Sequence, residues 1–195
     1  MPKMKYAITG SIGSGKTMVS EYIRSKSYHV FDCDACNKQL LENDKCTFNL
    51  IKDVFPSCIV DGKINKKVLS SIVFNNKEAK KKLENIMHPM ILNKMNEEVS
   101  LYHPFFAEVP LLFETNWDKY FDYCLLIVVD REIALDRLTL RGLDKQESLR
   151  RLNNQMSVDE KMARSDGIIY NNCDLQSLYR QVDIWLKDNV GEWFI

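Results

Sequence analysis

Apolar side chains along the chain fall into two patterns, short continuous runs and positions at helical spacing. The continuous runs of β-forming residues predict five strands, over residues 5–9, 28–32, 105–109, 123–130 and 167–170. The first run closes at Gly10 and is followed by apolar residues at helical spacing, so a strand, a loop and a helix open the chain. A second strand comes directly after, and this order is typical of a parallel sheet.

Between the second and third predicted strands, residues 35–102 carry a helical pattern instead. Asp61-Gly62 predicts a turn within this stretch, and Pro89 suits the first turn of a new helix. The pattern over residues 133–156 is helical and rich in arginine, and a last helix follows the fifth strand. The pattern therefore predicts one α/β core that carries smaller helical lobes.

Composition narrows the class of protein. The 195 residues include 27 lysines and arginines and 27 aspartates and glutamates, a balance that argues against a general nucleic-acid binder. The longest apolar run, residues 124–129, is far shorter than the roughly 18 residues of a membrane span, and the first residues contain no secretory segment. We expect a cytoplasmic protein that binds neither nucleic acid nor membrane, with its six cysteines as reduced thiols.

The loop after the first strand matches the phosphate-binding pattern G-x-x-x-x-G-K-[ST], known as Walker A. Its glycines let the backbone curl so that successive N–H groups point at phosphate oxygens, and the helix behind adds partial positive charge. Lys16 is expected to reach the β- and γ-phosphates, and the Thr17 hydroxyl to ligate Mg²⁺. The predicted ATP-binding residues of this loop are Ser11, Ile12, Gly13, Ser14, Gly15, Lys16, Thr17 and, through its backbone, Met18.

A phosphate loop indicates a nucleotide but not a reaction. The guanine-reading pattern N-K-x-D does not occur in the chain, so phosphoryl transfer to a small acceptor fits better than a GTPase. Asp32 and Asp34 stand at the end of the second strand, where ligands bind in open parallel sheets. One of them can accept a proton from an acceptor hydroxyl, and Asp34, which precedes a helix, also suits a plain N-cap.

Two further features admit two interpretations. Glu108, at the end of the third strand, suits a water-mediated contact with Mg²⁺ and equally an ordinary charge at a strand end. Cys33 and Cys36 have the spacing of a redox pair or half a zinc site. No second C-x-x-C accompanies them, so incidental thiols are the simpler interpretation.

Several short motifs follow the loop in order. They are Asp32-x-Asp34, Asp61-Gly62-x-Ile64-Asn65, Val73-Phe74, His88-Pro89-x-Ile91, Val109-Pro110-Leu111-Leu112-Phe113-Glu114, Arg137-Leu138-x-x-Arg141, Arg151-x-x-x-Gln155, Lys161 and Asp166. This series, from about residue 5 to 186, resembles the dephospho-CoA kinase family. Its His-Pro-x-Ile and Val-Pro-Leu-Leu-Phe-Glu pieces are much more specific than the phosphate loop.

The resemblance implies that ATP, with Mg²⁺, phosphorylates the 3′-hydroxyl of dephospho-CoA, which gives CoA and ADP in the last step of coenzyme A biosynthesis. It implies an α/β fold of the phosphate-loop NTPase type, in three layers, with a five-stranded parallel sheet, a helical acceptor-binding lobe and a helical lid. The single kinase domain, 1–195, then divides into a core of about 1–34, 103–136 and 165–195, a CoA-binding lobe of about 35–102 and a lid of about 137–164.

The resemblance also implies roles for particular residues. Asp34 is the expected catalytic base, with Lys16 and Arg141 as the other catalytic residues, and Arg137 and Arg141 hold ATP phosphates from the lid. Without the motif, arginines on a helix are usually a solvated face. Asn171 falls near the adenine by its position. The expected acceptor-binding residues are Asp34, His88, Pro110, Leu111 and Glu114, and the expected metal-binding residues are Thr17 and, through water, Glu108.

The chain departs from the family pattern in places. Ser11 replaces a usual glycine, and Met18 a usual serine or threonine. Glu108 stands where an aspartate is common, Leu92 replaces the arginine usual after His-Pro-x-Ile, and the lid segment between Arg141 and Gln155 is one residue shorter. None of these changes affects Lys16, Thr17, Asp34 or Arg141.

Three rival interpretations stay open at this point. The chain also fits a kinase of the same fold for another small acceptor, such as a nucleoside monophosphate. It fits a regulator that binds ATP without turnover, in which an Asp34→Asn variant behaves like the parent. A thiol or zinc module built on Cys33 and Cys36 is the third, and metal analysis distinguishes it.

Overall fold

The structure of the protein is a computed structural model, and it describes residues 4–74 and 76–191. The chain divides into two compact units. The first comprises Met1–Asp32 and Tyr102–Ile195, and the second comprises Cys33–Leu101. Residues 137–164 belong to the first unit, so a separate lid stays a prediction.

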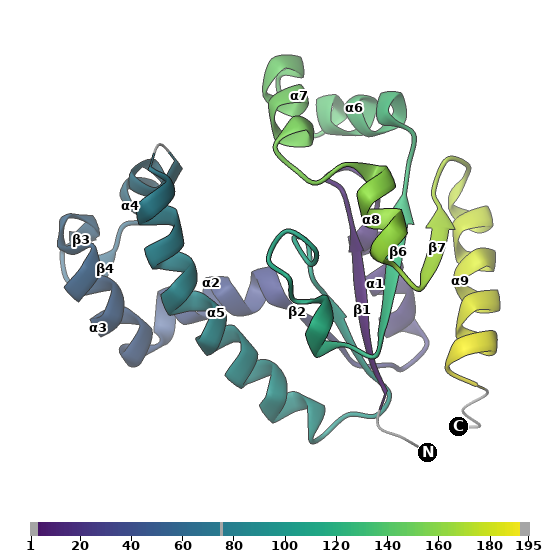
Figure 1. Cartoon of the computed structure of the whole chain (residues 1–195), viewed down its shortest axis with the longest axis horizontal. Coiled ribbons are helices and arrows are strands. Elements are labelled where there is room, and N and C mark those ends of the chain that lie inside the picture. The colour runs from purple at the N-terminus through teal and green to yellow at the C-terminus, as the bar shows by residue number, and fades with distance from the viewer. Residues whose placement is uncertain (1–3, 75, 192–195) are drawn as a thin grey trace. The chain divides into compact units, whose positions relative to one another are not determined.

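A five-stranded sheet of order β2-β5-β1-β6-β7 organises the first unit (Figure 1), and every pairing in it is parallel. The five predicted strands are confirmed. Strand β2 begins at Val30, two residues later than predicted, because only Val30–Asp32 pair with β5. The strands are β1 (Lys5–Gly10), β2 (Val30–Asp32), β5 (Phe105–Glu108), β6 (Tyr123–Val128) and β7 (Gly167–Tyr170).

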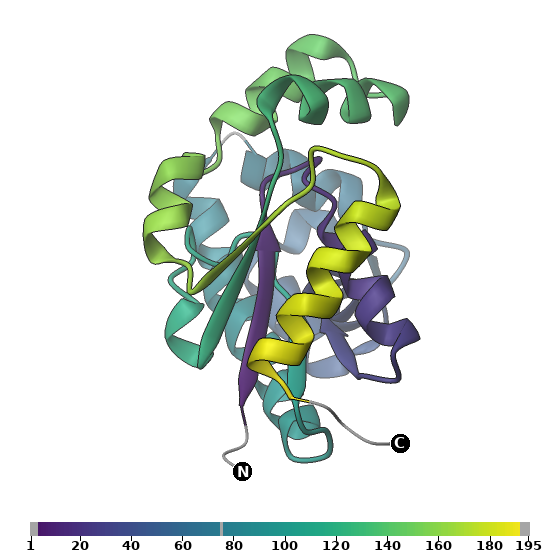
Figure 2. The same ribbon diagram turned by 90° about the vertical axis from the view of Figure 1, so that its right-hand side faces the viewer.

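Helices cover both faces of this sheet. The helices α1 and α9 lie against one face, and α8 lies on the other side, against β6 (Figure 2). The predicted three-layer α/β fold is therefore present in this unit. Its helices are α1 (Lys16–Ser25), η2 (Asp118–Tyr120), α6 (Arg131–Leu140), α7 (Lys145–Asn153), α8 (Val158–Arg164) and α9 (Leu175–Asn189).

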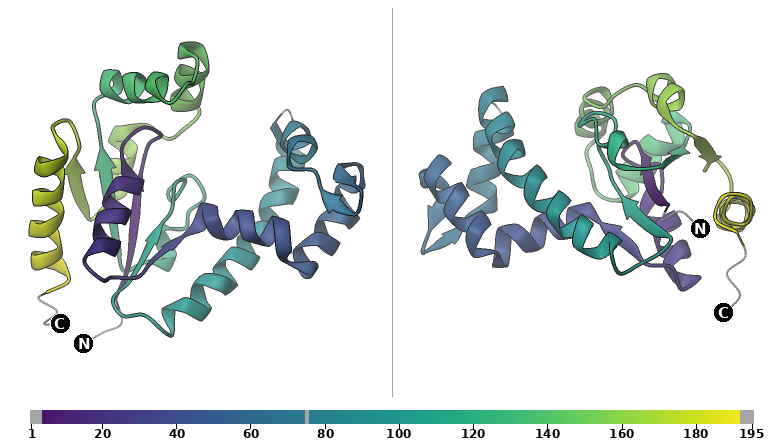
Figure 3. Two further views of the ribbon diagram at one scale, coloured as in Figure 1. Left: turned by 180° about the vertical axis from the view of Figure 1, so that it is seen from behind. Right: turned by 60° about the horizontal axis from the view of Figure 1, so that its bottom comes forward.

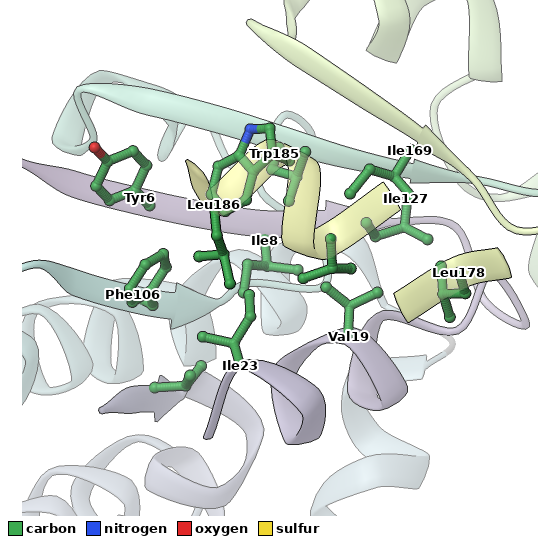
Figure 4. Packing of buried hydrophobic residues seen from close by; sticks show 13 residues of the cluster. Tyr6, Ile8, Val19, Ile23, Phe106, Ile127, Ile169, Leu178, Trp185 and Leu186 are labelled. Atoms are coloured by element: carbon green, nitrogen blue, oxygen red, sulfur yellow. The ribbon is translucent and has the colours of Figure 1, made fainter. Parts of the chain in front are cut away.

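The main core of the first unit lies between the sheet and the pair α1 and α9 (Figure 4). Tyr6 of β1 stacks on Phe106 of β5 with ring centroids 5.1 Å apart, and Trp185 of α9 meets Tyr6 edge-on at 5.7 Å. Val19 and Ile23 reach the same core from α1 and are fully buried. Because strand side chains alternate, this packing fixes β1 firmly and so fixes where the loop after it begins.

Residues 133–156 are largely helical, as predicted, but they form two helices, α6 and α7. The helix breaks at Gly142, whose φ of 84° lies in the left-handed region and ends α6. Asp144 then caps α7, since its carboxylate accepts hydrogen bonds from the backbone N–H groups of Gln146 and Glu147. The stop signal at Gly142 and the start signal at Asp144 lie two residues apart. Together they outweigh the arginine-rich pattern that the two helices share.

The second unit is largely helical, and its long helix α5 packs against α2, α3 and α4 (Figure 3). The prediction of a new helix at Pro89 is wrong, because α5 continues through it. Met87, Ile91 and Met95 are buried on both sides of the proline, so packing holds the two halves in one helix. The elements are α2 (Cys33–Asn43), α3 (Lys45–Val54), η1 (Pro56–Cys58), β3 (Ile59–Val60), β4 (Lys63–Ile64), α4 (Lys66–Phe74) and α5 (Lys77–Val99).

The predicted turn at Asp61-Gly62 is confirmed, but it joins two strands rather than two helices. Asp61 and Gly62 both have positive φ, 49° and 71°, the backbone of a tight hairpin turn. The turn links β3 and β4, which pair antiparallel over two residues each. Strands this short leave no alternating pattern, so the sequence pattern did not reveal them.

No helix within the described residues is long and apolar enough to cross a membrane. The described residues include all six cysteines, and no disulfide joins any of them. Burial, with the negative charges of Asp166 and Asp118, raises the pKa of the Cys124 thiol to about 12. Cys46 and Cys173, in contrast, are exposed.

These environments predict selective thiol chemistry. At about pH 8, an alkylating reagent is expected to label Cys46 and Cys173 quickly, because the thiolate is the reactive form and both side chains are accessible. Cys124 is expected to react only when the chain unfolds. Mass spectrometry of peptides sampled over time measures the rates, with a sample in denaturant as the control. Labelling of Cys124 as fast as Cys173 in the folded protein would contradict this structure.

Candidate nucleotide-binding site

The loop between β1 and α1 is built as the motif predicts, with a strand before it and a helix after it. Gly13 and Gly15 have φ values of 81° and 94°, which side chains other than glycine rarely adopt. A Cβ atom on Gly15 would lie 2.2 Å from the side-chain nitrogen of Asn171. Glycine is required at Gly15 for both reasons, and it places the start of α1 directly after the curled backbone.

Lys16 is the first residue of α1, and its Nζ donates a hydrogen bond to the carbonyl oxygen of Ser11, 3.2 Å away. The ammonium group therefore lies back over the loop. Thr17 follows it in the first turn of the helix, where backbone N–H groups give the partial positive charge that favours phosphate. Among the predicted loop residues, Gly13, Ser14 and Gly15 are buried.

Two side chains from distant segments hold the loop in place. Asn171, directly after β7, is buried and donates through Nδ2 to the carbonyl oxygen of Ser14 at 2.8 Å. Arg137 of α6 donates to the carbonyl oxygen of Asn171 at 3.0 Å and to that of Gly13 at 3.4 Å. The amide nitrogen of Asn171 thus serves the loop, and its predicted place near the adenine stays a prediction.

The two predicted lid arginines have different environments. Arg137 is half-buried, and burial, followed by the nearby charge of Arg141, lowers its guanidinium pKa. Arg141 is exposed at the carboxyl end of α6. Arg137 is therefore engaged with the loop backbone, whereas the Arg141 side chain is accessible to a ligand.

The predicted metal-binding pair is brought together. The Thr17 hydroxyl, in the first turn of α1, donates to Oε1 of Glu108 at the end of β5, 2.9 Å away. Glu108 is only 5% exposed, and its Oε2 is buried with no hydrogen-bond partner among the described residues. A hydroxyl beside an unsatisfied carboxylate oxygen is a donor set of hard oxygens, and it fits Mg²⁺. Asp32 lies beside Glu108 in register on β2.

The sequence predicted Asp34 at the end of the second strand, and the structure differs. Asp32 is the last residue of β2, and α2 begins at Cys33, so Asp34 lies in the first turn of a helix. The N-cap interpretation is wrong for the same reason. The Asp34 side chain is exposed there.

The other predicted acceptor residues divide between the two units. Asp34 and His88 belong to the second unit, whereas Pro110, Leu111 and Glu114 belong to the first. Leu111 is 39% exposed. Oε1 of Glu114 lies 2.8 Å from the Lys161 ammonium nitrogen and accepts the Met156 N–H at 3.1 Å. Glu114 is thus engaged inside the first unit, and its contact with an acceptor stays a prediction.

Sequence reasoning missed the residues that support the loop. Gln155 accepts a hydrogen bond from the backbone N–H of Ile12 at 3.0 Å, and Lys161 is fully buried. Both residues stand in the motif series, but local pattern assigns neither a role, since each contacts a residue far away in the sequence. A polar residue buried in an otherwise exposed basic segment is the signal that a structure supplies.

Together, the fold and the loop define an α/β protein of the phosphate-loop class. The family model described as dephospho-CoA kinase matches residues 4–177. The chain belongs to the dephospho-CoA kinase family, whose members phosphorylate dephospho-CoA with ATP in the last step of coenzyme A biosynthesis.

Individual relatives agree with this assignment. A dephospho-CoA kinase of Fusobacterium nucleatum is 34% identical over 188 residues, which cover 94% of this chain and 97% of that protein. The crystal structure of TT1252 from Thermus thermophilus has a TM-score of 0.85 at 34% identity and covers 95% of this chain and 97% of that one. A shikimate kinase of Acinetobacter baumannii, 12% identical with a TM-score of 0.58, covers 97% of this chain and 94% of that one and shares the fold alone.

The burial of His88 predicts how the stability of the folded protein depends on pH. His88 lies half-buried in α5, and this burial lowers the pKa of its imidazole, which the carboxylate of Glu84 only partly opposes. In the unfolded chain, the imidazole of His88 has the ordinary pKa of about 6.5, whereas burial in the folded chain opposes its protonation. Stability from this residue is therefore present above that pH and is lost as the pH falls through the folded pKa.

We expect the parent to lose more unfolding free energy than His88→Gln between about pH 7.5 and about pH 5.5. The difference is at most about 1.4 kcal/mol, the value of one pH unit below the unfolded pKa. Urea unfolding at the two pH values measures it, and the variant at the higher pH is the control for lost packing. Equal losses in both proteins would show that burial of His88 does not oppose its protonation.

Proposed function

We propose that the residues described above divide the work of the family reaction as follows. The protein is a phosphotransferase of the dephospho-CoA kinase family, and ATP is its co-substrate. The phosphate loop, Ser11 to Thr17 with the Met18 N–H, receives the triphosphate. Backbone donors suit this task because they are fixed before the ligand arrives, which favours charge that develops during transfer.

Positive side chains stabilise the transferred group. Lys16, held over the loop by Ser11, gives up that carbonyl contact and donates to the β- and γ-phosphates. Arg141 is exposed and forms a planar, bidentate partner for a phosphate, whereas Arg137 acts from a fixed place beside Gly13. Asn171 keeps the loop in the shape that the triphosphate requires.

Thr17 and Glu108 are the residues that hold Mg²⁺. The Thr17 hydroxyl is the direct ligand, and Glu108 acts through water, because this ion keeps several of its waters. The bound ion supplies positive charge next to the phosphates. The buried, unsatisfied Oε2 of Glu108 supports this assignment, since an orphaned carboxylate oxygen is costly without a cation or a water.

Asp34 is the base in this proposal. Its carboxylate accepts the proton of the 3′-hydroxyl of dephospho-CoA as the oxygen attacks the γ-phosphorus, and ADP leaves. Its side chain is exposed and lies in the first turn of α2, in the unit that also contains His88. His88, Pro110 and Leu111 contact the acceptor. Glu114 belongs to the same proposed set, and its carboxylate also contacts Lys161.

One observation carries the proposal: the hydroxyl of Thr17 in α1 faces the buried Glu108 at the end of β5, within a chain that matches the dephospho-CoA kinase family over 4–177. A phosphate loop with no metal-binding partner would fit a passive nucleotide-binding protein equally well.

Thiols that form no disulfide are typical of a reducing compartment, and this supports a cytoplasmic location.

The reaction is tested by measuring ADP release with Mg-ATP and a panel of acceptors. We expect fast turnover with dephospho-CoA and little with AMP, CMP, pantetheine phosphate or water. Lys16→Ala is expected to abolish turnover, and Asp34→Asn to lower kcat by about 10²- to 10⁴-fold, the usual contribution of a general base. Lys187→Ala and Asp188→Asn, exposed in α9, are matched controls. Fast turnover with another acceptor, or unchanged kcat in Asp34→Asn, would overturn the assignment.

The metal assignment makes a separate prediction. Glu108→Gln keeps an oxygen that can accept the Thr17 hydrogen bond but removes the charge. We expect the Mg²⁺ concentration at half-maximal velocity to rise by about 10- to 100-fold, as for other residues that orient metal ligands. Thr17→Ser retains the hydroxyl and serves as the control. An unchanged Mg²⁺ requirement in Glu108→Gln would assign Glu108 to loop support alone.

A further inference from the structure

A side chain outside the Walker A motif holds the first part of the phosphate loop. The backbone N–H of Ile12 donates to Oε1 of Gln155 at 3.0 Å, in a partly buried contact that joins residues 143 positions apart. Gln155 follows α7 and is only partly exposed. The N–H groups of such a loop are the donors that phosphates use, so an acceptor on one of them acts on the ligand-binding backbone itself.

The segment that carries Gln155 is fixed at the very next residue. The Met156 N–H donates to Oε1 of Glu114 at 3.1 Å, and the same oxygen lies 2.8 Å from Nζ of Lys161 in α8. Contacts therefore run without a gap from Lys161 through Glu114 and Met156 to Gln155, and from there to Ile12.

Burial makes this anchor rigid. The Lys161 side chain is 1% exposed and that of Glu114 is 18% exposed, so the ion pair has largely lost its water. Removing one partner of such a pair leaves an uncompensated buried charge, whereas replacing both with neutral groups is often tolerated. The pair thus has two separable properties, its charge balance and the hydrogen bond that it offers to Met156.

We propose that Gln155 is a positioning residue for ATP, which sets the loop through Ile12, and that the Glu114–Lys161 ion pair keeps Gln155 in place. This inference rests on the proposed function, because it takes ATP as the ligand of the loop. A neutral amide suits this position. A carboxylate would accept the same hydrogen bond but would add negative charge beside the triphosphate.

The first test separates the oxygen from the charge at residue 155. Gln155→Ala is expected to raise KM for ATP by about two- to tenfold, the value of one hydrogen bond, with kcat and KM for dephospho-CoA nearly unchanged. Gln155→Glu retains the oxygen and is expected to raise KM for ATP further. Gln146→Ala, at an exposed position of α7, is the matched control. If residue 155 only supports the fold, Gln155→Glu will behave like the parent.

The second test is a double-mutant cycle on the ion pair. Glu114→Gln and Lys161→Met are each expected to raise KM for ATP and lower the melting temperature, because each leaves one buried charge unpaired. The combined variant is expected to return toward the parent in both quantities. If Glu114 instead binds the acceptor, Glu114→Gln will raise KM for dephospho-CoA, and the second substitution will not restore it.

Direct binding keeps the two proposals distinguishable. Calorimetric titration with ATP and Mg²⁺ measures affinity for the loop without any acceptor. If the parent does not bind ATP, the proposed function fails. If the parent binds ATP but Gln155→Ala and Gln155→Glu bind as tightly as the parent, or more tightly, the positioning role is overturned while the kinase assignment stands. If a single variant of the ion pair does not fold, the combined variant and the two Gln155 variants still decide the question.

Discussion

The shape of the phosphate loop depends on the hydrogen bond from Asn171 to the carbonyl oxygen of Ser14. A loop whose N–H groups converge on a ligand must direct its carbonyl groups elsewhere, and a buried carbonyl without a donor is costly. Asn171 satisfies that group from below the loop, and Gly15 is the residue that lets it approach. Arg137 extends this support to Gly13 and to the backbone of Asn171. Support for these carbonyl groups holds the backbone in the curled shape that directs N–H groups toward a phosphate.

Charge at the carboxyl edge of the sheet follows from the order of its strands. The order places β5 between β2 and β1, so Glu108 has Asp32 on one side and the phosphate loop on the other. Two acidic residues on adjacent strands, beside a loop that attracts anions, are unfavourable unless cations lie near both. In the function proposed above, Lys16 and a divalent cation held by Thr17 and Glu108 supply this positive charge. The same edge therefore suits a nucleotide with its metal better than either component alone.

Much of this architecture was predictable from the sequence, for identifiable reasons. Buried parallel strands are continuous apolar runs, and the Walker A pattern describes a local backbone shape, so both were found without a structure. The break at Gly142 and the continuous helix through Pro89 were not found, because each depends on a balance between local signals and packing. The contacts of Asn171 and Gln155 were also missed, since they join segments 157 and 143 residues apart. Motif position indicated that these residues matter but not what they touch.

The order of strands in the sheet also governs when each strand can pair during synthesis of the chain. Strand β1 pairs with β5, beginning with Lys5 opposite Phe105. The whole second unit lies between these two strands in the sequence. Closing such a distance has an entropic cost that no local contact offsets, so β1 stays unpaired on that side until β5 has been made. Asn171 is made later still. On the ribosome, the helical insert can fold first as its own unit, and the nucleotide site becomes complete only when the last strand and its asparagine have emerged.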